Sequence, residues 1–145
     1  YETFKNQTKL ATKNKNMFTI EEIKLAHSKV KSGADFPAYI QDIKQLGVTH
    51  YETFVSNGNS DYYGENNYKV STGTRYPLLA ISDKSDVAQF KLDIKAHQQG
   101  NTDFPTFCKD CATSGIEKWV IYIDKMTCTY YDLAGNEVLT ELIPS

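Results

Sequence analysis

The chain has 145 residues, of which 40% are hydrophobic, 12% aromatic and 23% charged, and its formal net charge is −2. These values are typical of one soluble globular domain, and they disfavour binding to nucleic acid or to an anionic membrane surface. The longest purely apolar run, 119–123, is too short to cross a bilayer, and no secretory signal is visible. Three cysteines are too few for a disulfide scaffold, so we expect a cytoplasmic protein.

The first segment of the chain differs in composition from the rest. Residues 1–16 hold four lysines and one glutamate, a charge of +3, which leaves −5 for residues 17–145. The segment shows no apolar period of a helix or a strand over a useful length. We therefore predict that residues 1–16 are a flexible tail or an added, non-native extension, and that a single domain covers residues 17–145. The alternative is a native tail in which residues 8–12 add an edge strand.

Two pairs of helices are predicted, each recognised by a capping residue, a stripe of apolar residues and a closing glycine. Thr19 and Glu22 form the clearest signal, because a hydroxyl and a carboxylate three residues apart can cap each other's backbone N–H groups. The other predicted caps are Asp35, Asp86 and Asp103, and the predicted stops are Gly33, Gly47, Gly100 and Gly115.

Each helix pair is followed by residues that favour strands, rich in aromatic and β-branched side chains and separated by turns. The predicted strands are 48–55, a segment around Tyr62 and Tyr63, 68–71, 77–82, 116–123, 127–132 and 137–143. The sequence therefore predicts an α+β fold in which helices pack on an antiparallel sheet.

The two halves of the chain resemble each other. At a shift of 68 residues, seven positions are identical: Asp35-Phe36-Pro37 with Asp103-Phe104-Pro105, Asp42 with Asp110, Gly47 with Gly115, and Tyr62-Tyr63 with Tyr130-Tyr131. Because glycine and proline mark the boundaries of elements, their agreement favours a duplicated unit over chance similarity. We predict two pseudo-repeats, about 18–82 and 83–145, each a helix pair followed by a β-meander, around a shared core.

A pattern in the second half resembles a known family. The residues that carry the resemblance are Phe104, Phe107, Cys108, Ala112, Gly115, Ile116, Trp119, Val120, Tyr130 and Tyr131. The pattern is similar to the C-terminal signature of the YdfO-like family of small uncharacterised bacterial and prophage proteins, some of them labelled phage envelope proteins. The resemblance covers residues 17–145 and implies a duplicated α+β fold and a bacterial or phage origin. It implies no catalytic residue.

The cysteines are the first candidates for chemistry. Cys108 and Cys111 form a C-x-x-C pair, which favours a redox dithiol, or a zinc site completed by Cys128 and His97. No second metal-binding pair accompanies them, and the shift of 68 aligns them with isoleucines on an apolar helix stripe. Buried structural thiols are therefore the preferred interpretation, and we expect no metal and no cofactor.

The histidines of the helices have a similar interpretation. His27 and His97 lie on the predicted inward stripes, so we expect core or half-buried rings, although a histidine beside an apolar surface can also act as a base.

One strand face is the preferred candidate site. Strand alternation places His50, Glu52 and Phe54 on the face opposite Tyr51, and the matching face of the second half carries Lys118 and Tyr122. If Tyr51 and Trp119 point to the helices, this mixed face is the outer one. The candidate ligand or partner face is thus His50, Glu52, Phe54, Lys118 and Tyr122, and the bland alternative is an ordinary solvated sheet face.

These observations favour a non-enzymatic module that binds a small ligand or a protein. The alternative is a small enzyme that uses His50 as general base, with Glu52 or Tyr122 assisting, in a cleft between the repeats. A homodimer formed through the open face is a third possibility. An enclosed cavity around His50, Glu52 and Lys118 would favour chemistry, whereas an open face would favour a protein partner.

Overall fold

The structure is a computed structural model that describes residues 17–31 and 33–144. The tail predicted for residues 1–16 and its alternative strand at 8–12 lie outside the described residues. Within the described ranges the fold is α+β, as predicted, with four α-helices and a six-stranded antiparallel sheet. The elements in chain order are α2 (Ile20–His27), η1 (Gly33–Asp35), α3 (Phe36–Leu46), β1 (His50–Phe54), β2 (Ser60–Tyr63), η2 (Glu65–Asn67), β3 (Lys69–Ser71), α4 (Val87–Gln98), α5 (Phe104–Thr113), β4 (Ile116–Tyr122), β5 (Thr127–Asp132) and β6 (Glu137–Leu142).

Most of the predicted helix caps are confirmed. The Thr19 hydroxyl accepts a hydrogen bond from the Glu22 N–H at 3.2 Å, and the Glu22 carboxylate accepts one from the Thr19 N–H at 3.0 Å. Asp86 and Asp103 each accept a hydrogen bond from the N–H three residues later. Asp35 is the exception, because its carboxylate does not cap α3 and instead accepts from the backbone N–H of Lys31 at 2.9 Å.

Glycines end the second helix of each pair. Gly47 after α3 and Gly115 after α5 have φ angles of 109° and 83°, in the left-handed region that favours glycine. At Gly115 space is also limiting, since a Cβ there would lie 2.7 Å from the backbone oxygen of Lys84. Gly33 does not have this role: α2 ends at His27, and Gly33 begins the 3₁₀ turn η1.

The strand order of the sheet is β3-β2-β1-β4-β5-β6, with every neighbouring pair antiparallel. The first half of the chain therefore supplies one side of the sheet and the second half the other. They meet where β1 pairs with β4, and Glu52 lies opposite Val120 in the middle of that pairing.

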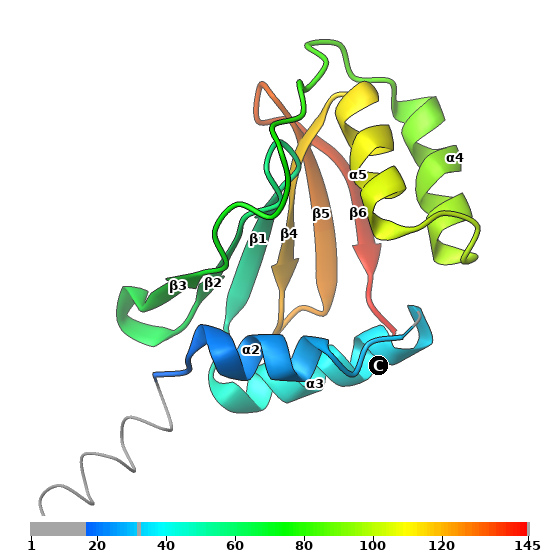
Figure 1. Cartoon of the computed structure of the whole chain (residues 1–145). Helices are drawn as coiled ribbons and strands as arrows, with labels where there is room; N and C mark the ends of the chain where they lie inside the picture. The colour runs from blue at the N-terminus through cyan, green and yellow to red at the C-terminus, as the bar shows by residue number, and fades with distance from the viewer. Residues whose placement is uncertain (1–16, 32, 145) are drawn as a thin grey trace, which may run out of the picture.

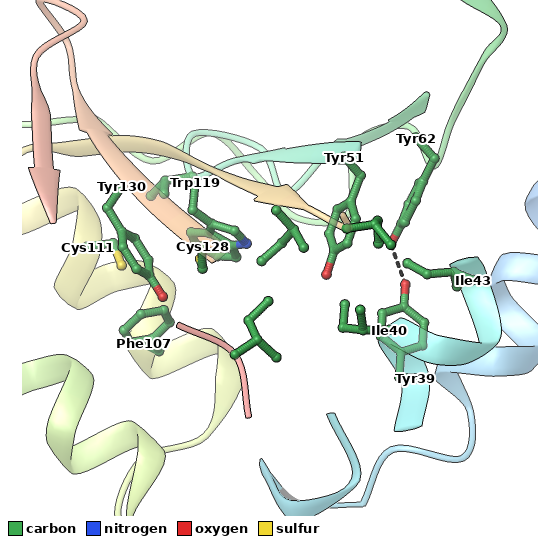
Figure 2. Packing of buried hydrophobic residues seen from close by; sticks show 14 of the residues in the cluster. Tyr39, Ile40, Ile43, Tyr51, Tyr62, Phe107, Cys111, Trp119, Cys128 and Tyr130 are labelled. Carbon is green, nitrogen blue, oxygen red and sulfur yellow. Dashed lines mark hydrogen bonds between the residues drawn. The ribbon is translucent and has the colours of Figure 1, made fainter. Parts of the chain in front are cut away.

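Both helix pairs pack on one face of this sheet. In Figure 1, α2 and α3 cross one end of the strands, while α4 and α5 run beside β5 and β6. The inward side chains of the strands meet them in one buried cluster, and Figure 2 shows Tyr51, Tyr62, Trp119, Cys128 and Tyr130 reaching from the sheet toward residues of α3 and α5. The opposite face of the sheet is covered by none of the described helices.

One predicted strand is wrong. Residues 77–82 are irregular, although they contain an apolar run from Leu78 to Ile81. The N–H of Leu79 donates to the carbonyl of Ser56, and the N–H of Ser82 donates to the carbonyl of Ala112. Because these acceptors are far apart in the chain, the segment does not pair with a neighbouring strand. Leu79 and Ile81 pack on the core, so apolar burial holds the segment without a β-ladder.

None of the described helices is long and apolar enough to span a membrane.

Candidate functional site

The structure brings four of the five predicted site residues around one depression on the uncovered face of the sheet. His50 and Glu52 of β1 and Lys118 and Tyr122 of β4 line an open depression of about 380 Å³. Val120, Tyr131 and Gly135 complete its lining. Phe54, the fifth predicted residue, does not line it, but its ring lies beside Lys118. Tyr51 and Trp119 are buried on the opposite face, as expected from strand alternation.

An ion pair occupies the middle of the depression. The Lys118 ammonium donates to Oε1 of Glu52 at 2.9 Å, and the Tyr63 hydroxyl donates to Oε2 at 3.1 Å. Both carboxylate oxygens of Glu52 are therefore already hydrogen-bonded. Burial, together with the negative charge of Glu52, raises the pKa of Tyr63, so this hydroxyl remains a donor at neutral pH.

A row of stacked rings runs along one side of the depression, and two of them, His50 and Tyr122, line it. The His50 imidazole stacks on Tyr63 of β2 at 4.6 Å and on Tyr122 of β4 at 6.0 Å between ring centroids. Lysines lie over the outer rings, with Lys69 Nζ 5.9 Å from the Tyr63 centroid and Lys125 Nζ 5.4 Å from that of Tyr122. The row thus joins three strands and has a lysine at each end, of which Lys69 also forms an ion pair with Asp61 at 3.7 Å.

A second row lies opposite the first. Lys118 Nζ is 5.7 Å from the ring centroids of both Phe54 and Tyr131, so the ammonium lies between two aromatic rings. Burial and the neighbouring Tyr122 raise the pKa of Tyr131. Because His50 and Phe54 are four residues apart on one strand, the rows are separated by about 13 Å, and Glu52 and Val120 form the floor between them.

The predicted catalytic partners of His50 are engaged elsewhere or are not bonded to it. His50 Nδ1 lies 3.1 Å from the Thr49 hydroxyl, and within the described residues no hydrogen bond joins His50 to Glu52 or Tyr122. A general base works best when a third group orients it and water is excluded. Here Glu52 is held by Lys118 and Tyr63, and the depression is open to solvent.

The cysteines lie elsewhere, in the core. Cys108, Cys111 and Cys128 are free and buried. Burial raises the pKa of all three thiols, that of Cys128 to about 12, so they are protonated and poorly reactive at neutral pH. Among the residues that the structure describes, no three His, Cys, Asp or Glu side chains converge in a way that could hold a metal ion.

The two helix histidines differ from each other. His97 is half-buried, stacks on Phe107 at 4.4 Å, and its Nδ1 lies 3.0 Å from the carbonyl oxygen of Thr102, so it is part of the α4–α5 packing. His27 is more exposed than expected for a residue on the inward stripe of α2. Its ring contacts the edge of Tyr39, with 5.2 Å between centroids.

Sequence reasoning missed Tyr63 and Tyr131, which complete the two rows. Their signal was present in part, because both belong to the repeated Tyr-Tyr pair. The register was the missing information: Tyr63 lies opposite His50, and Tyr131 lies opposite Lys118. Only paired strands reveal that each tyrosine stands beside a predicted site residue.

Comparison with known protein families identifies relatives of this chain. The model of a family described as proteins of unknown function, DUF1398, matches residues 24–142. The chain belongs to the DUF1398 family. Every residue that lines the depression lies within the DUF1398 match. Membership of an uncharacterised family is thus confirmed, whereas the YdfO-like name and its phage association stay predictions. No curated protein matches the chain.

Proposed function

We propose that this DUF1398 member is a non-enzymatic recognition module whose uncovered sheet face binds a protein partner. The observation that carries the proposal is the open depression between two rows of half-buried aromatic side chains. Tyrosine is enriched in protein interfaces because its large ring is apolar and its hydroxyl can form a hydrogen bond. An open shape of this kind fits a partner surface better than it encloses a small molecule.

The charges of the face indicate the chemistry of that partner. The Glu52–Lys118 pair is already neutralised, with the two side chains 18% and 31% exposed, so the centre needs no charged partner. A partner segment would place an apolar or aromatic side chain over Val120. A carbonyl or carboxylate oxygen at one end would meet Lys125, which lies over the Tyr122 ring, whereas Lys69 at the other end is already paired with Asp61.

We also propose that the fold arose by duplication, because the strand pairings repeat. His50 pairs with Tyr63, and Lys118, 68 residues after His50, pairs with Tyr131, 68 residues after Tyr63. The pairing of β3 with β2 at Tyr63 and Lys69 has its counterpart at Tyr131 and Glu137.

The central pairing of β1 with β4 supports the same proposal. The pairing is symmetric about Glu52 and Val120, because His50 faces Tyr122 on one side and Phe54 faces Lys118 on the other. The shift of 68 relates His50 to Lys118 and Phe54 to Tyr122, so it converts one of these pairs into the other. The binding depression would then lie on a pseudo-two-fold axis, with His50 and Lys118 each between two rings.

A cytoplasmic location is part of this proposal. Three buried free thiols fit a compartment that keeps cysteine reduced. Fractionation of the native host should recover the protein with soluble cytoplasmic markers, and recovery with extracytoplasmic markers would overturn this part.

Selection from a random peptide display library tests the binding proposal. The whole chain should enrich peptides that lose at least roughly tenfold in affinity for Tyr122→Ala, as expected when an interface aromatic is removed. Leu92→Ala is the matched control, because Leu92 is exposed on α4. The affinity of this variant for the selected peptides should not change. Binding should shift NMR signals of His50, Lys118 and Tyr131. Enrichment that Tyr122→Ala does not reduce, or shifts confined to α4 and α5, would contradict the proposal.

Sedimentation velocity separates a foreign partner from a second copy. We expect a monomer at all concentrations. A concentration-dependent dimer that Val120→Arg abolishes would overturn the proposal of a foreign partner and assign the face to self-association.

A further inference from the structure

A second depression, of about 300 Å³, lies between α2 and β2, the strand next to the edge strand β3. Its lining residues are Lys24, His27 and Ser28 from the end of α2, Tyr62 from β2, and Thr72 and Arg75 from the segment after β3. Lys24, His27 and Arg75 are exposed, whereas Tyr62 is buried at 3% exposure. The cationic side chains of Lys24 and Arg75 and the titratable ring of His27 therefore surround the buried Tyr62. The lining contains no carboxylate.

Arg75 is the strongest indication of a ligand. It is the chain's single arginine, and its Nη2 donates to the Ser60 hydroxyl at 3.2 Å. Within the part of the chain that the structure describes, neither ion pair involves Arg75. A guanidinium carries five N–H donors in a fixed fork, so an anchored Arg75 keeps donors for an oxyanion.

The buried tyrosine adds a neutral donor. The Tyr62 and Tyr39 hydroxyls are 2.7 Å apart, as the dashed line in Figure 2 shows. One proton serves that bond, so when Tyr39 donates, the Tyr62 proton remains available to a ligand. Burial raises the pKa of Tyr62, which keeps the hydroxyl protonated at neutral pH.

The positive groups of the pocket repel one another in the absence of an anion. Although His27 is exposed as a whole, its ring lies against Tyr39, and this partial desolvation lowers its pKa, which the charge of Arg75 lowers further. An anion between the two side chains would remove that repulsion and favour the imidazolium. The carbonyl end of α2 opposes an anion only weakly, because the Ser28 N–H and hydroxyl already bond to the carbonyls of Lys24 and Leu25.

The second half of the chain has no such group of residues. At a shift of 67, His27 corresponds to Ile94, which is buried at 4% exposure, and Arg75 has no arginine counterpart because the chain contains a single arginine. The second half thus uses a packed isoleucine at the position of His27, and the polar pair is a feature of the first half alone.

We propose that this pocket binds the phosphate group of a small phosphomonoester, with Arg75 as its main anchor. A dianion fits the two permanent charges of Lys24 and Arg75 better than a carboxylate does, and the Arg75 fork can hold two phosphate oxygens. The volume, at the low end for ligand sites, limits the ligand to a small molecule.

Proton NMR titration of His27 in the full chain tests the proposal, with glycerol 3-phosphate, inorganic phosphate and chloride compared at equal ionic strength. The monoester should raise the pKa of His27 and raise the melting temperature, whereas chloride should do neither. Arg75→Met should weaken binding of the monoester about tenfold or more, the usual loss of a hydrogen bond to a charged group. Lys91→Met is the matched control, because Lys91 is the counterpart of Lys24 in the second half, and it should bind normally.

Three results would overturn the proposal. The first is a His27 response to phosphate no larger than that to chloride. The second is unchanged affinity in Arg75→Met, provided that its amide spectrum shows a folded protein. The third is tighter binding of inorganic phosphate than of the monoester, which would replace the phosphomonoester with free phosphate. Lys24→Met, at an exposed site away from the core, gives an independent variant that should also weaken binding.

Discussion

The two halves of the molecule build the same succession of elements with different polar groups. In α3 the inward positions are Ile40 and Ile43, and in α5 the corresponding positions are Cys108 and Cys111, all buried at 1% exposure or less. The first half instead has polar groups at its surface, His27 and Arg75, and the second half has the buried Ile94 at the position of His27. The inward side of the second helix is thus buried in both halves, whereas these exposed polar donors lie in the first half.

The centre of the sheet shows a similar contrast. Glu52 of β1 faces Val120 of β4, so one strand supplies a carboxylate and the other an apolar floor. Lys118 of the second half then pairs with Glu52 of the first. The depression thus needs both halves, whereas the pocket around Arg75 is built from the first half alone.

The largest effect should come from the glycine that closes α5. Gly115→Ala should lower the free energy of unfolding by about 3 kcal/mol or more, because its left-handed φ is costly for alanine and the new Cβ would also press on the backbone of Lys84 and Ser85. Gly135→Ala, at a φ of 85° with no atom near the added Cβ, is the control and should lose about 1–2 kcal/mol. Urea unfolding measures both. Equal losses would show that the connection between the halves is not tightly packed at this point.

The thiols of the second half should make the protein sensitive to alkali. An unfolded thiol ionises near pH 9, whereas the pKa of folded Cys128 is raised to about 12. The stabilisation from the raised pKa is complete below pH 9 and is lost as the pH rises toward 12. Each such group contributes a slope of about 1.4 kcal/mol per pH unit.

Cys128→Ala tests this expectation. Between pH 9 and pH 12 the free energy of unfolding of the variant should fall less steeply, by the slope that one group contributes. The smaller side chain also lowers the stability, but by the same amount at every pH. Unfolding curves at several alkaline pH values measure the slope, and a slope identical to that of the natural chain would contradict the assignment.

The hydrogen bond between the buried Tyr39 and Tyr62 of the first half should contribute less to the free energy of unfolding than Gly115 does. Tyr39→Phe copies Phe107, its counterpart in the second half, and leaves the Tyr62 hydroxyl without its buried partner. We expect a loss of about 1–2 kcal/mol. The double variant Tyr39→Phe/Tyr62→Phe should lose less than the sum of the single variants, which a thermal or urea double-mutant cycle would detect. Strict additivity would mean that the two hydroxyls do not interact.

The central ion pair should have the smallest effect on stability. Glu52→Gln removes the charge but keeps an acceptor for Tyr63, and both partners are partly exposed. The expected loss is about 0–1 kcal/mol and should shrink further at high salt, because exposed pairs are screened. Unfolding at low and high salt measures it. A larger loss that salt does not reduce would indicate that the pair supports the joint between the halves.

Local signals in the sequence predicted much of the fold. The capping residues, apolar stripes and glycine stops act within a few residues, so they located the helices and most strands. They failed where a tertiary contact replaced the local preference. Residues 77–82 contain a short apolar run, but the N–H groups of Leu79 and Ser82 bond to the carbonyls of Ser56 and Ala112. His27 was expected to point inward, yet α2 leaves it exposed beside Arg75.

The candidate site was predictable where alternation alone decides the outcome. His50, Glu52, Lys118 and Tyr122 were expected on one outer face, and the structure gathers these four around one depression. Tyr63 and Tyr131 could not be assigned to it without the strand register. The pocket around Arg75 had no sequence signal, since its residues come from a helix end, a strand and an irregular segment.

By itself, then, the amino-acid sequence determined which segments become helices and strands and which face of each is apolar, because periodicity and capping depend on neighbours one to four residues away. Only the tertiary structure decided that Glu52 meets Lys118, 66 residues later, and that His27 and Arg75 share a cavity. Such pairs follow from how six strands and two helix pairs bury their apolar sides together, a balance to which residues along the whole chain contribute.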